Sequence, residues 1–321
     1  MNTGRETVDR RLQIAECGLK EREPQGTRGH SSRQSSIVNR QSFLCSILIL
    51  LLLCASAPLG SSFASLPGAT PLNPPGPAGS KKLIALTFDD GPRPWVLKGD
   101  TQAGFASSSL LDLLDHEGVK ATFFVMAWRL APAADSECRK IDVGITCLQA
   151  AEEEHRRGHE IENHTYGHGD FRLMNKRYGE AWILNDIDRA SRAIEPITGV
   201  KPKYVRPPDW DIWPELAQHI EARGYHVMTK STSVPPVLRD VDSEDYFCYG
   251  KNQSKCPQPS LYDYVLRTIE QRERKGIDGQ ILVFHELPGS VQVLSRLIPE
   301  LKKRGYMFVT LQQYMVAEKG S

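Results

Sequence analysis

The chain has 321 residues, of which 40% are hydrophobic, 25% charged and 8% aromatic, and this composition excludes a protein that is disordered throughout. Its 40 basic residues balance 39 acidic ones, so a formal charge of +1 provides no field that would concentrate nucleic acid or anionic membranes. We therefore expect no nucleic-acid partner, and the length allows either two average domains or a single α/β barrel.

The first predicted element is an export signal. Residues 1–41 form a basic leader, and residues 42–64 contain an apolar run, Phe43–Ala57, that is typical of the hydrophobic region of a signal peptide. Ser62 and Ala64 place small residues at the two positions that a signal peptidase reads. The sequence therefore predicts cleavage after Ala64.

A single-pass membrane anchor is the alternative for the same segment, because a basic leader also suits a tail that faces the cytosol. The apolar run is shorter than the roughly 20 residues that cross a bilayer. We therefore expect a secreted protein, with the cell wall as one destination. A membrane is expected as a partner only if the apolar segment is retained.

The rest of the chain predicts one α/β domain over residues 81–321, preceded by a Pro- and Gly-rich linker over residues 65–80. Short β-rich runs alternate with amphipathic helical stretches, which is typical of a parallel sheet with crossover helices. About seven β/α units favour a closed or nearly closed barrel, with loop insertions at residues 93–105 and 232–258. The predicted strands are Leu83–Phe88, Ala121–Val125, Glu160–Asn163, Tyr204–Arg206, His226–Thr229, Ile281–His285 and Met307–Thr310.

Two of the helices have clear apolar stripes. Leucines at residues 110–114 predict one helix, with Ser107 as its cap, and apolar residues between Tyr262 and Ile269 predict another. We interpret these side chains as core residues without a chemical role.

Four cysteines of the predicted domain form two close pairs, Cys138 with Cys147 and Cys248 with Cys256. In an exported protein such pairs indicate two local disulfides, with free thiols as the alternative. Neither pair has the spacing of a zinc-binding motif. Asn252 begins a glycosylation sequon inside the second pair, which is typical of a surface loop.

Two adjacent carboxylates follow the first predicted strand. The run from Leu83 ends at Asp89 and Asp90, and Gly-Pro then breaks the strand. Neighbours on a strand point to opposite faces, but both side chains can converge where the chain turns. One carboxylate could then bind a metal while the other meets a water molecule. A turn in which the carboxylates cap amides is the alternative.

Two histidines follow the third predicted strand. His164 and His168 stand four residues apart, so a single helical turn would put both imidazoles on one face, as two zinc ligands require. A pair with this spacing also occurs without any metal. An Asp from another strand would supply the third ligand.

Two further strand ends carry polar residues. An apolar strand ends at His285, whose imidazole titrates near neutrality and suits a general acid. Arg206 could pair with one of the carboxylates and keep it ionised, and the prolines up to Pro208 fix a loop whose next backbone amide, that of Asp209, could face an oxyanion. A surface salt bridge and a turn are the alternative for this second strand end.

Taken in order, four of these motifs resemble the polysaccharide deacetylases, which are carbohydrate esterase family 4. The motifs are Thr87-Phe-Asp-Asp-Gly-Pro92, His164-Thr-Tyr-Gly-His168, Arg206-Pro-Pro208 and Leu282-Val-Phe-His285. The resemblance runs from about Lys82 to the end of the chain. It implies a distorted (β/α) barrel and the hydrolysis of acetyl groups on glycans.

The resemblance also implies a role for each residue. Asp90, His164 and His168 would hold a Zn²⁺ ion, with Co²⁺, Mn²⁺ or Ni²⁺ as alternatives. Asp89 would be the general base and His285 the general acid, and Arg206 would orient Asp89.

One position departs from the family pattern. Asp209-Trp210 stands where family members carry an aromatic residue and then Gly, so we expect the Asp209 side chain to point away from the oxyanion and Trp210 to contact a sugar or pack in the core. The family's aspartate-tryptophan motif is not evident, although Asp242-Ser-Glu-Asp-Tyr246 could be its displaced counterpart. Pro208, Asp209 and Trp210 are the predicted substrate contacts.

The substrate is expected to be a chitin-like polymer of N-acetylglucosamine, because His164-Thr-Tyr resembles the chitin deacetylases. An esterase for O-acetylated polysaccharide such as acetylxylan, an amidase for another substrate and a non-catalytic carbohydrate-binding protein are the alternatives.

Overall fold

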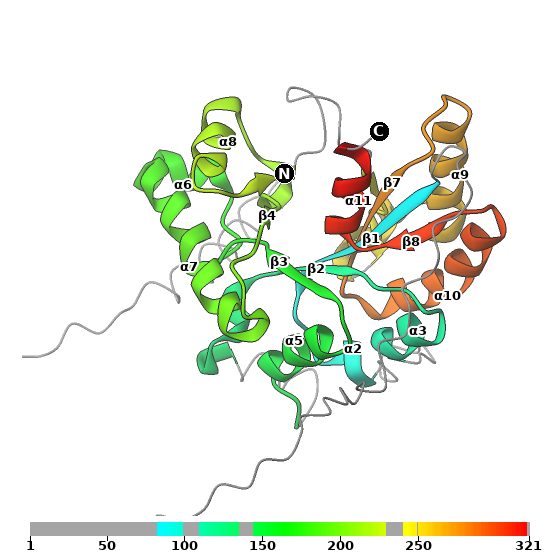
Figure 1. Cartoon of the computed structure of the whole chain (residues 1–321), viewed down its shortest axis with the longest axis horizontal. Coiled ribbons are helices and arrows are strands. Elements are labelled where there is room, and N and C mark those ends of the chain that lie inside the picture. Colours follow the sequence, from blue (N-terminus) through cyan, green and yellow to red (C-terminus); the bar gives the residue numbers. More distant parts are fainter. Residues whose placement is uncertain (1–81, 99–108, 135–143, 229–239, 249, 320–321) are drawn as a thin grey trace, which may run out of the picture. The chain divides into compact units, whose positions relative to one another are not determined.

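Eight strands form one sheet in the computed structural model, which describes residues 82–98, 109–134, 144–228, 240–248 and 250–319 (Figure 1). The strands are β1 Leu83–Gly91, β2 Thr122–Val125, β3 Glu160–Asn163, β4 Tyr204–Val205, β5 His226–Val227, β6 Asp240–Asp242, β7 Gln280–His285 and β8 Met307–Val309. All their pairings are parallel, in the order β5-β4-β3-β2-β1-β7-β6 with β8 also beside β1. Seven of the eight lie at predicted positions.

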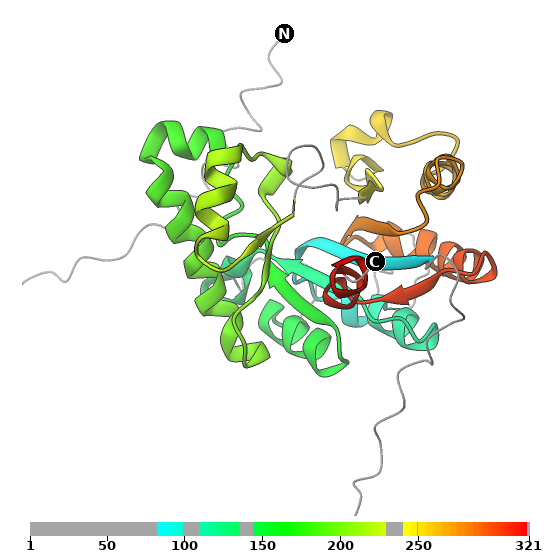
Figure 2. The ribbon, with the colours of Figure 1, turned by 45° about the horizontal axis from the view of Figure 1, so that its top comes forward.

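The sheet curls into an open barrel, with helices on either side of the strands in Figure 2. Within the described residues, β5 and β6 end the sheet and do not pair with each other. The predicted distorted (β/α) barrel is thus confirmed, with one more strand than expected. The additional strand, β6, lies in a segment predicted to be a loop insertion. Its three residues, Asp-Val-Asp, are too few and too polar to predict a strand.

Helices cover the outer surface of the sheet. Figure 1 shows α6, α7 and α8 at one side and α9 and α10 at the other. The helices are α2 Trp95–Lys98, α3 Leu110–His116, α5 Cys147–Arg156, α6 Phe171–Tyr178, α7 Glu180–Thr198, α8 Pro214–Glu221, α9 Leu261–Glu273, α10 Pro288–Lys303 and α11 Leu311–Lys319. The largest hydrophobic cluster joins α3, α9 and α10 to β1 and β7. Apolar stripes on these helices therefore hold the central strands in place.

The helix over residues 110–116 has a different cap from the predicted one. The Ser109 hydroxyl accepts a hydrogen bond from the Asp112 amide, so Ser109 is the N-cap. The predicted cap, Ser107, lies outside the described residues. The second predicted helix is present as α9.

A second hydrophobic cluster fills the end of the barrel where the strands begin. It joins Leu83 and Ala85 of β1 with Leu311 and Tyr314 of α11. Because α11 packs against the start of β1, this end is closed by side chains, and the carboxyl ends of the strands remain available for a site.

Several predictions fall outside the described residues. They are the leader, the apolar run, the linker and Cys138. Within the part of the chain that the structure describes, no helix combines the length and apolar character that a membrane span requires.

Replacing Gly91 with alanine is expected to destabilise the fold. A methyl group there would lie 1.4 Å from Oε1 of Glu286, whose other carboxylate oxygen accepts a hydrogen bond from the Arg93 amide. Such overpacking costs about 1–3 kcal/mol, measurable by thermal or urea unfolding. Gly167→Ala is the matched control, because its methyl group would approach nothing closer than 3.7 Å. Equal stability of the two variants would contradict the expectation.

Candidate active site

A cavity of about 250 Å³ opens at the carboxyl ends of the strands. The register places Asp89 of β1 directly opposite His285 of β7. The cavity is lined by Asp89, Asp90, His164, His168, Pro207, Asp209, Trp210, Asp242, Tyr246, Val283 and His285. Five residues predicted to carry the chemistry thus meet in one cavity.

Asp89 and Asp90 both reach the cavity because β1 is irregular at its end. The pairing of β1 with β2 shifts register between Phe88 and Gly91, and Asp90 has a φ of 67°. This left-handed conformation turns two consecutive side chains to the same side, which a regular strand would not do.

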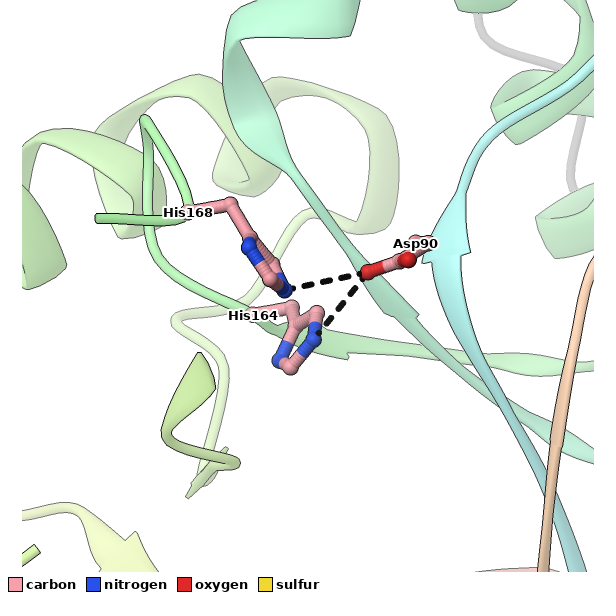
Figure 3. A group of neighbouring side chains, drawn as sticks. All are labelled: Asp90, His164 and His168. Atoms are coloured by element: carbon pink, nitrogen blue, oxygen red, sulfur yellow. Dashed lines mark ion pairs between the residues drawn. The ribbon is translucent and has the colours of Figure 1, made fainter. Parts of the chain in front are cut away.

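The candidate metal ligands converge on one point (Figure 3). Oδ1 of Asp90 lies 3.4 Å from Nε2 of His164 and 3.1 Å from Nε2 of His168. One ligand atom from each residue lies within 4.8 Å of the other two. Two imidazole nitrogens and a carboxylate oxygen are a ligand set that suits Zn²⁺ and leaves room for water or substrate.

The loop that carries the two histidines is not the helical turn that the sequence predicts. Thr165 and His168 both have left-handed φ values, 67° and 53°. The side chain of Asn163 accepts from the Thr165 amide, and that of Asp186 accepts from the amides of residues 166 and 167. These hydrogen bonds replace the helical ones, and the imidazoles meet through the irregular loop.

The protonation of the ligands fits a metal site. Nδ1 of His164 lies 2.8 Å from the Arg206 carbonyl oxygen, which can only accept, so Nδ1 carries the hydrogen and Nε2 is left as the ligand atom. Burial opposes ionisation of Asp90, but His168 and His164 outweigh it and hold the pKa of Asp90 well below its usual value. Asp90 is therefore a carboxylate ready to bind a cation.

The candidate base is held by a buried arginine. Nη1 of Arg206 donates to Oδ1 of Asp89 at 2.6 Å and to the Thr87 hydroxyl at 3.0 Å. Arg206 is fully buried, and its guanidinium lies 4.0 Å from the centre of the Phe124 ring. A charge-assisted hydrogen bond in such surroundings fixes the orientation of the Asp89 carboxylate.

The candidate acid is held by a carboxylate that was not predicted. Nδ1 of His285 donates to Oδ1 of Asp245 at 2.6 Å, and the His285 amide and the Ser290 hydroxyl both donate to Oδ2. Burial alone would lower the pKa of His285, but the charges of Asp245, Asp90 and Asp89 raise it to about 10. The imidazole thus carries its proton at neutral pH, as a general acid must.

Asp242, Asp245 and Tyr246 complete the site from β6 and the turn that follows it. Asp242 and Tyr246 line the cavity, and the Tyr246 ring lies edge-on to His285 at 5.1 Å. In the sequence, these residues could have been found through the Asp242-Ser-Glu-Asp-Tyr246 segment, which we interpreted as a possible displaced counterpart of the family's aspartate-tryptophan motif. Its contacts with β7 are consistent with that interpretation.

The predicted substrate contacts divide into two groups. Asp209 and Trp210 line the cavity, whereas Pro208 is buried and its neighbour Pro207 lines the wall instead. Asp209 and Trp210 have left-handed φ values of 52° and 59°. Trp210 also lies 5.1 Å from the Arg206 guanidinium, so its ring packs over the arginine that holds Asp89.

Three of the four cysteines of the predicted pairs lie within the described residues. Cys248 and Cys256 form a disulfide that ties the turn after Asp245 to the segment before α9. Cys147 is also disulfide-bonded, and its predicted partner Cys138 lies outside the described residues. The side chain of Asn252 lies outside them as well.

Comparison with known proteins agrees with the geometry of the site. A model of the polysaccharide deacetylase family matches residues 76–228, which include Asp89, Asp90, both ligand histidines and Arg206. Residues 76–228 of the chain belong to the polysaccharide deacetylase family. The matched span stops before His285, which joins the site through the pairing of β7 with β1.

Individual polysaccharide deacetylases are similar over part of their length. A bifunctional xylanase/deacetylase of Pseudobutyrivibrio xylanivorans is 27% identical, covering 73% of this chain and 30% of that protein. A chitin deacetylase of Pestalotiopsis sp. is 30% identical, covering 50% of this chain and 45% of that one. The chain therefore spans less than half the length of these curated relatives.

A solved structure shows the same fold. The carbohydrate esterase 4 domain of a multidomain xylanase, from the hindgut metagenome of Trinervitermes trinervoides, is 26% identical. It aligns with a TM-score of 0.50, covering 74% of this chain and 92% of that domain.

Proposed function

We propose that the chain is a metal-dependent hydrolase that removes acetyl groups from polysaccharides built of N-acetylglucosamine, as in chitin. One observation carries the proposal. Three candidate metal ligands, a carboxylate held by a buried arginine and an imidazole held by a buried carboxylate share one cavity. A protein that only binds carbohydrate would need neither the metal ligands nor the two hydrogen-bonded pairs.

Asp90, His164 and His168 would hold the metal, which we propose to be Zn²⁺, with Co²⁺, Mn²⁺ or Ni²⁺ as alternatives. When bound, a divalent cation supplies Lewis-acid polarisation of the acetyl carbonyl and acidifies a water molecule. The ligand atoms fit this role because Oδ1 of Asp90 faces both imidazoles and makes no hydrogen bond to any described residue.

The chain's own residues would move the protons. Arg206 holds the Asp89 carboxylate in place. Asp89 would accept a proton from the attacking water while the water oxygen bonds to the acetyl carbon. The Asp209 amide would donate to the oxyanion that develops. His285 then gives its proton to the sugar nitrogen as the carbon–nitrogen bond breaks. Acetate and a free amine are the products.

Acetate release from a substrate panel tests the proposal. The purified chain, loaded with Zn²⁺ or Co²⁺, is expected to release acetate from chitin oligomers and to lose this activity when a chelator removes the metal. Release from acetylxylan alone would favour the esterase alternative. Binding of chitin without release from any substrate, peptidoglycan included, would favour a carbohydrate-binding protein.

Secretion belongs to the same proposal, because a polysaccharide substrate of this kind lies outside the cell. Amino-terminal sequencing of the protein recovered from culture medium checks it. A mature chain that begins at Ser65 supports cleavage after Ala64. Recovery of an intact chain from the membrane fraction supports the anchor.

A further inference from the structure

Asp240 is a buried carboxylate for which the proposed chemistry has no use. It lies on β6 opposite Ile281 of β7, and Asp242, two residues further along the strand, lines the cavity. Residues two apart on a strand share a face, so Asp240 lies on the cavity side, one step deeper in the barrel. Both of its carboxylate oxygens are buried without a hydrogen-bond partner among the described residues. Such a group in a folded protein calls for an explanation.

Arg206 has donors that remain unused. Nη1 donates to Asp89 and Thr87, whereas Nε and Nη2 are buried and make no hydrogen bond to any residue that the structure describes. Arginine has five N–H donors, so the guanidinium can serve a second carboxylate as well as Asp89. Arg206 is thus a buried cation with unused donors, and Asp240 is a buried carboxylate whose oxygens accept no hydrogen bond from the described residues.

The charges around Asp240 connect it to the candidate base. Burial raises the pKa of Asp240 to about 7. Arg206 and, more weakly, Arg272 oppose this rise, whereas Asp89 and Asp242 add to it. Arg206 lies at the end of β4 and Arg272 on α9. Asp89 belongs to β1, and Asp242 to β6 itself. Asp240 can therefore gain or lose its proton near neutral pH, and both members of the Asp89–Arg206 pair act electrostatically on it.

We propose that Asp240 is a positioning residue for the proposed deacetylation, because it shares the positive charge of Arg206 with Asp89 and so sets how readily Asp89 accepts a proton. An ionised Asp240 competes for Arg206 and repels the charge on Asp89, which makes Asp89 a stronger proton acceptor. A protonated Asp240 leaves Arg206 to Asp89 alone. The inference rests on the proposed function, since Asp89 must act as a base.

The pH dependence of Asp240→Asn tests the proposal, since asparagine keeps the shape and cannot ionise. The ratio of kcat/KM, wild type to variant, is expected to rise about threefold between about pH 5.5 and about pH 8.5. The ratio cancels other titrations in the site, including that of a metal-activated water. Glu152→Gln, an exposed acid-to-amide change on α5, should give a ratio that does not depend on pH. A constant ratio for Asp240→Asn overturns the proposal.

A second measurement needs no activity, so it separates this inference from the proposed function. The native state holds the Asp240 proton more tightly than the unfolded chain does. Wild type should therefore lose stability relative to Asp240→Asn as the pH rises from 3.8 to about 7, and lose no more above that range. Urea unfolding over this range measures the difference, and Asp240→Ser repeats the comparison if the first variant does not fold. A difference that is independent of pH overturns the proposal even if no substrate is found.

Discussion

Asp89→Asn is expected to lower kcat for acetate release by on the order of 10²–10⁴-fold, the usual contribution of a general base, while the protein keeps its bound metal. Asparagine has the shape of aspartate but cannot take a proton from water. The candidate metal ligands come from Asp90, His164 and His168, so metal content should stay at the wild-type level. Acetate assays together with metal analysis of the purified variant check both parts.

The fold of Asp89→Asn must be checked as well, because the variant leaves Arg206 buried with its charge less well compensated. Breaking a buried pair in this way costs about 3–5 kcal/mol of stability. Asp188→Asn is the matched control, because Asp188 pairs with Arg223 outside the cavity lining and with both side chains partly exposed. Loss of metal from Asp89→Asn would mean that Asp89 and Asp90 have each other's role.

His285→Gln is expected to lower kcat by about 10²–10⁴-fold on an N-acetyl substrate, and much less on an aryl acetate. An amine leaves poorly unless it is protonated as the carbon–nitrogen bond breaks, whereas a phenolate leaves without a proton. The two substrates therefore separate the loss of the acid from general damage to the site. His155→Gln, at an exposed position on α5, is the control. An equal loss on both substrates would contradict the role of His285 as the acid.

Asp245, which holds His285, should control the loss of kcat on the alkaline side of the pH profile. Asp245 raises the pKa of His285, so the acid form is present below that pKa and is lost as the pH rises through it. Asp245→Asn should move this loss to lower pH. The same variant should leave the acid side of the profile, where His285 is already protonated, largely in place.

The parts of the site that could be predicted are those at the ends of well-patterned strands. Asp89, Asp90 and His285 follow apolar runs long enough to indicate buried strands, and parallel strands bring their carboxyl ends to one edge. His164 and His168 were recognisable by their types and spacing. The order of the motifs pointed to the family, and the family comparison confirms it.

The remaining features depend on contacts between residues far apart in the chain. Asp245 joins His285 across 40 residues, and β6 is too short and polar to be recognised before β7 pairs with it. The loop that carries the histidines is shaped by Asp186, a residue of α7 that no local pattern links to it. In both places tertiary hydrogen bonds decide the conformation, and local propensity does not.

The strand that carries Asp89 and the turn that carries Asp245 should differ in how they respond to heating. β1, which carries Asp89 and Asp90, pairs with β2, β7 and β8, so its amides can exchange with solvent only when most of the protein unfolds. Asp245 follows β6, which has three residues and lies at the edge of the sheet in the described part of the chain, and such edges open in local fluctuations. The turn that carries Asp245 should therefore loosen first on warming. Asp89 and the candidate metal ligand Asp90 would then stay in place after Asp245 has begun to release His285.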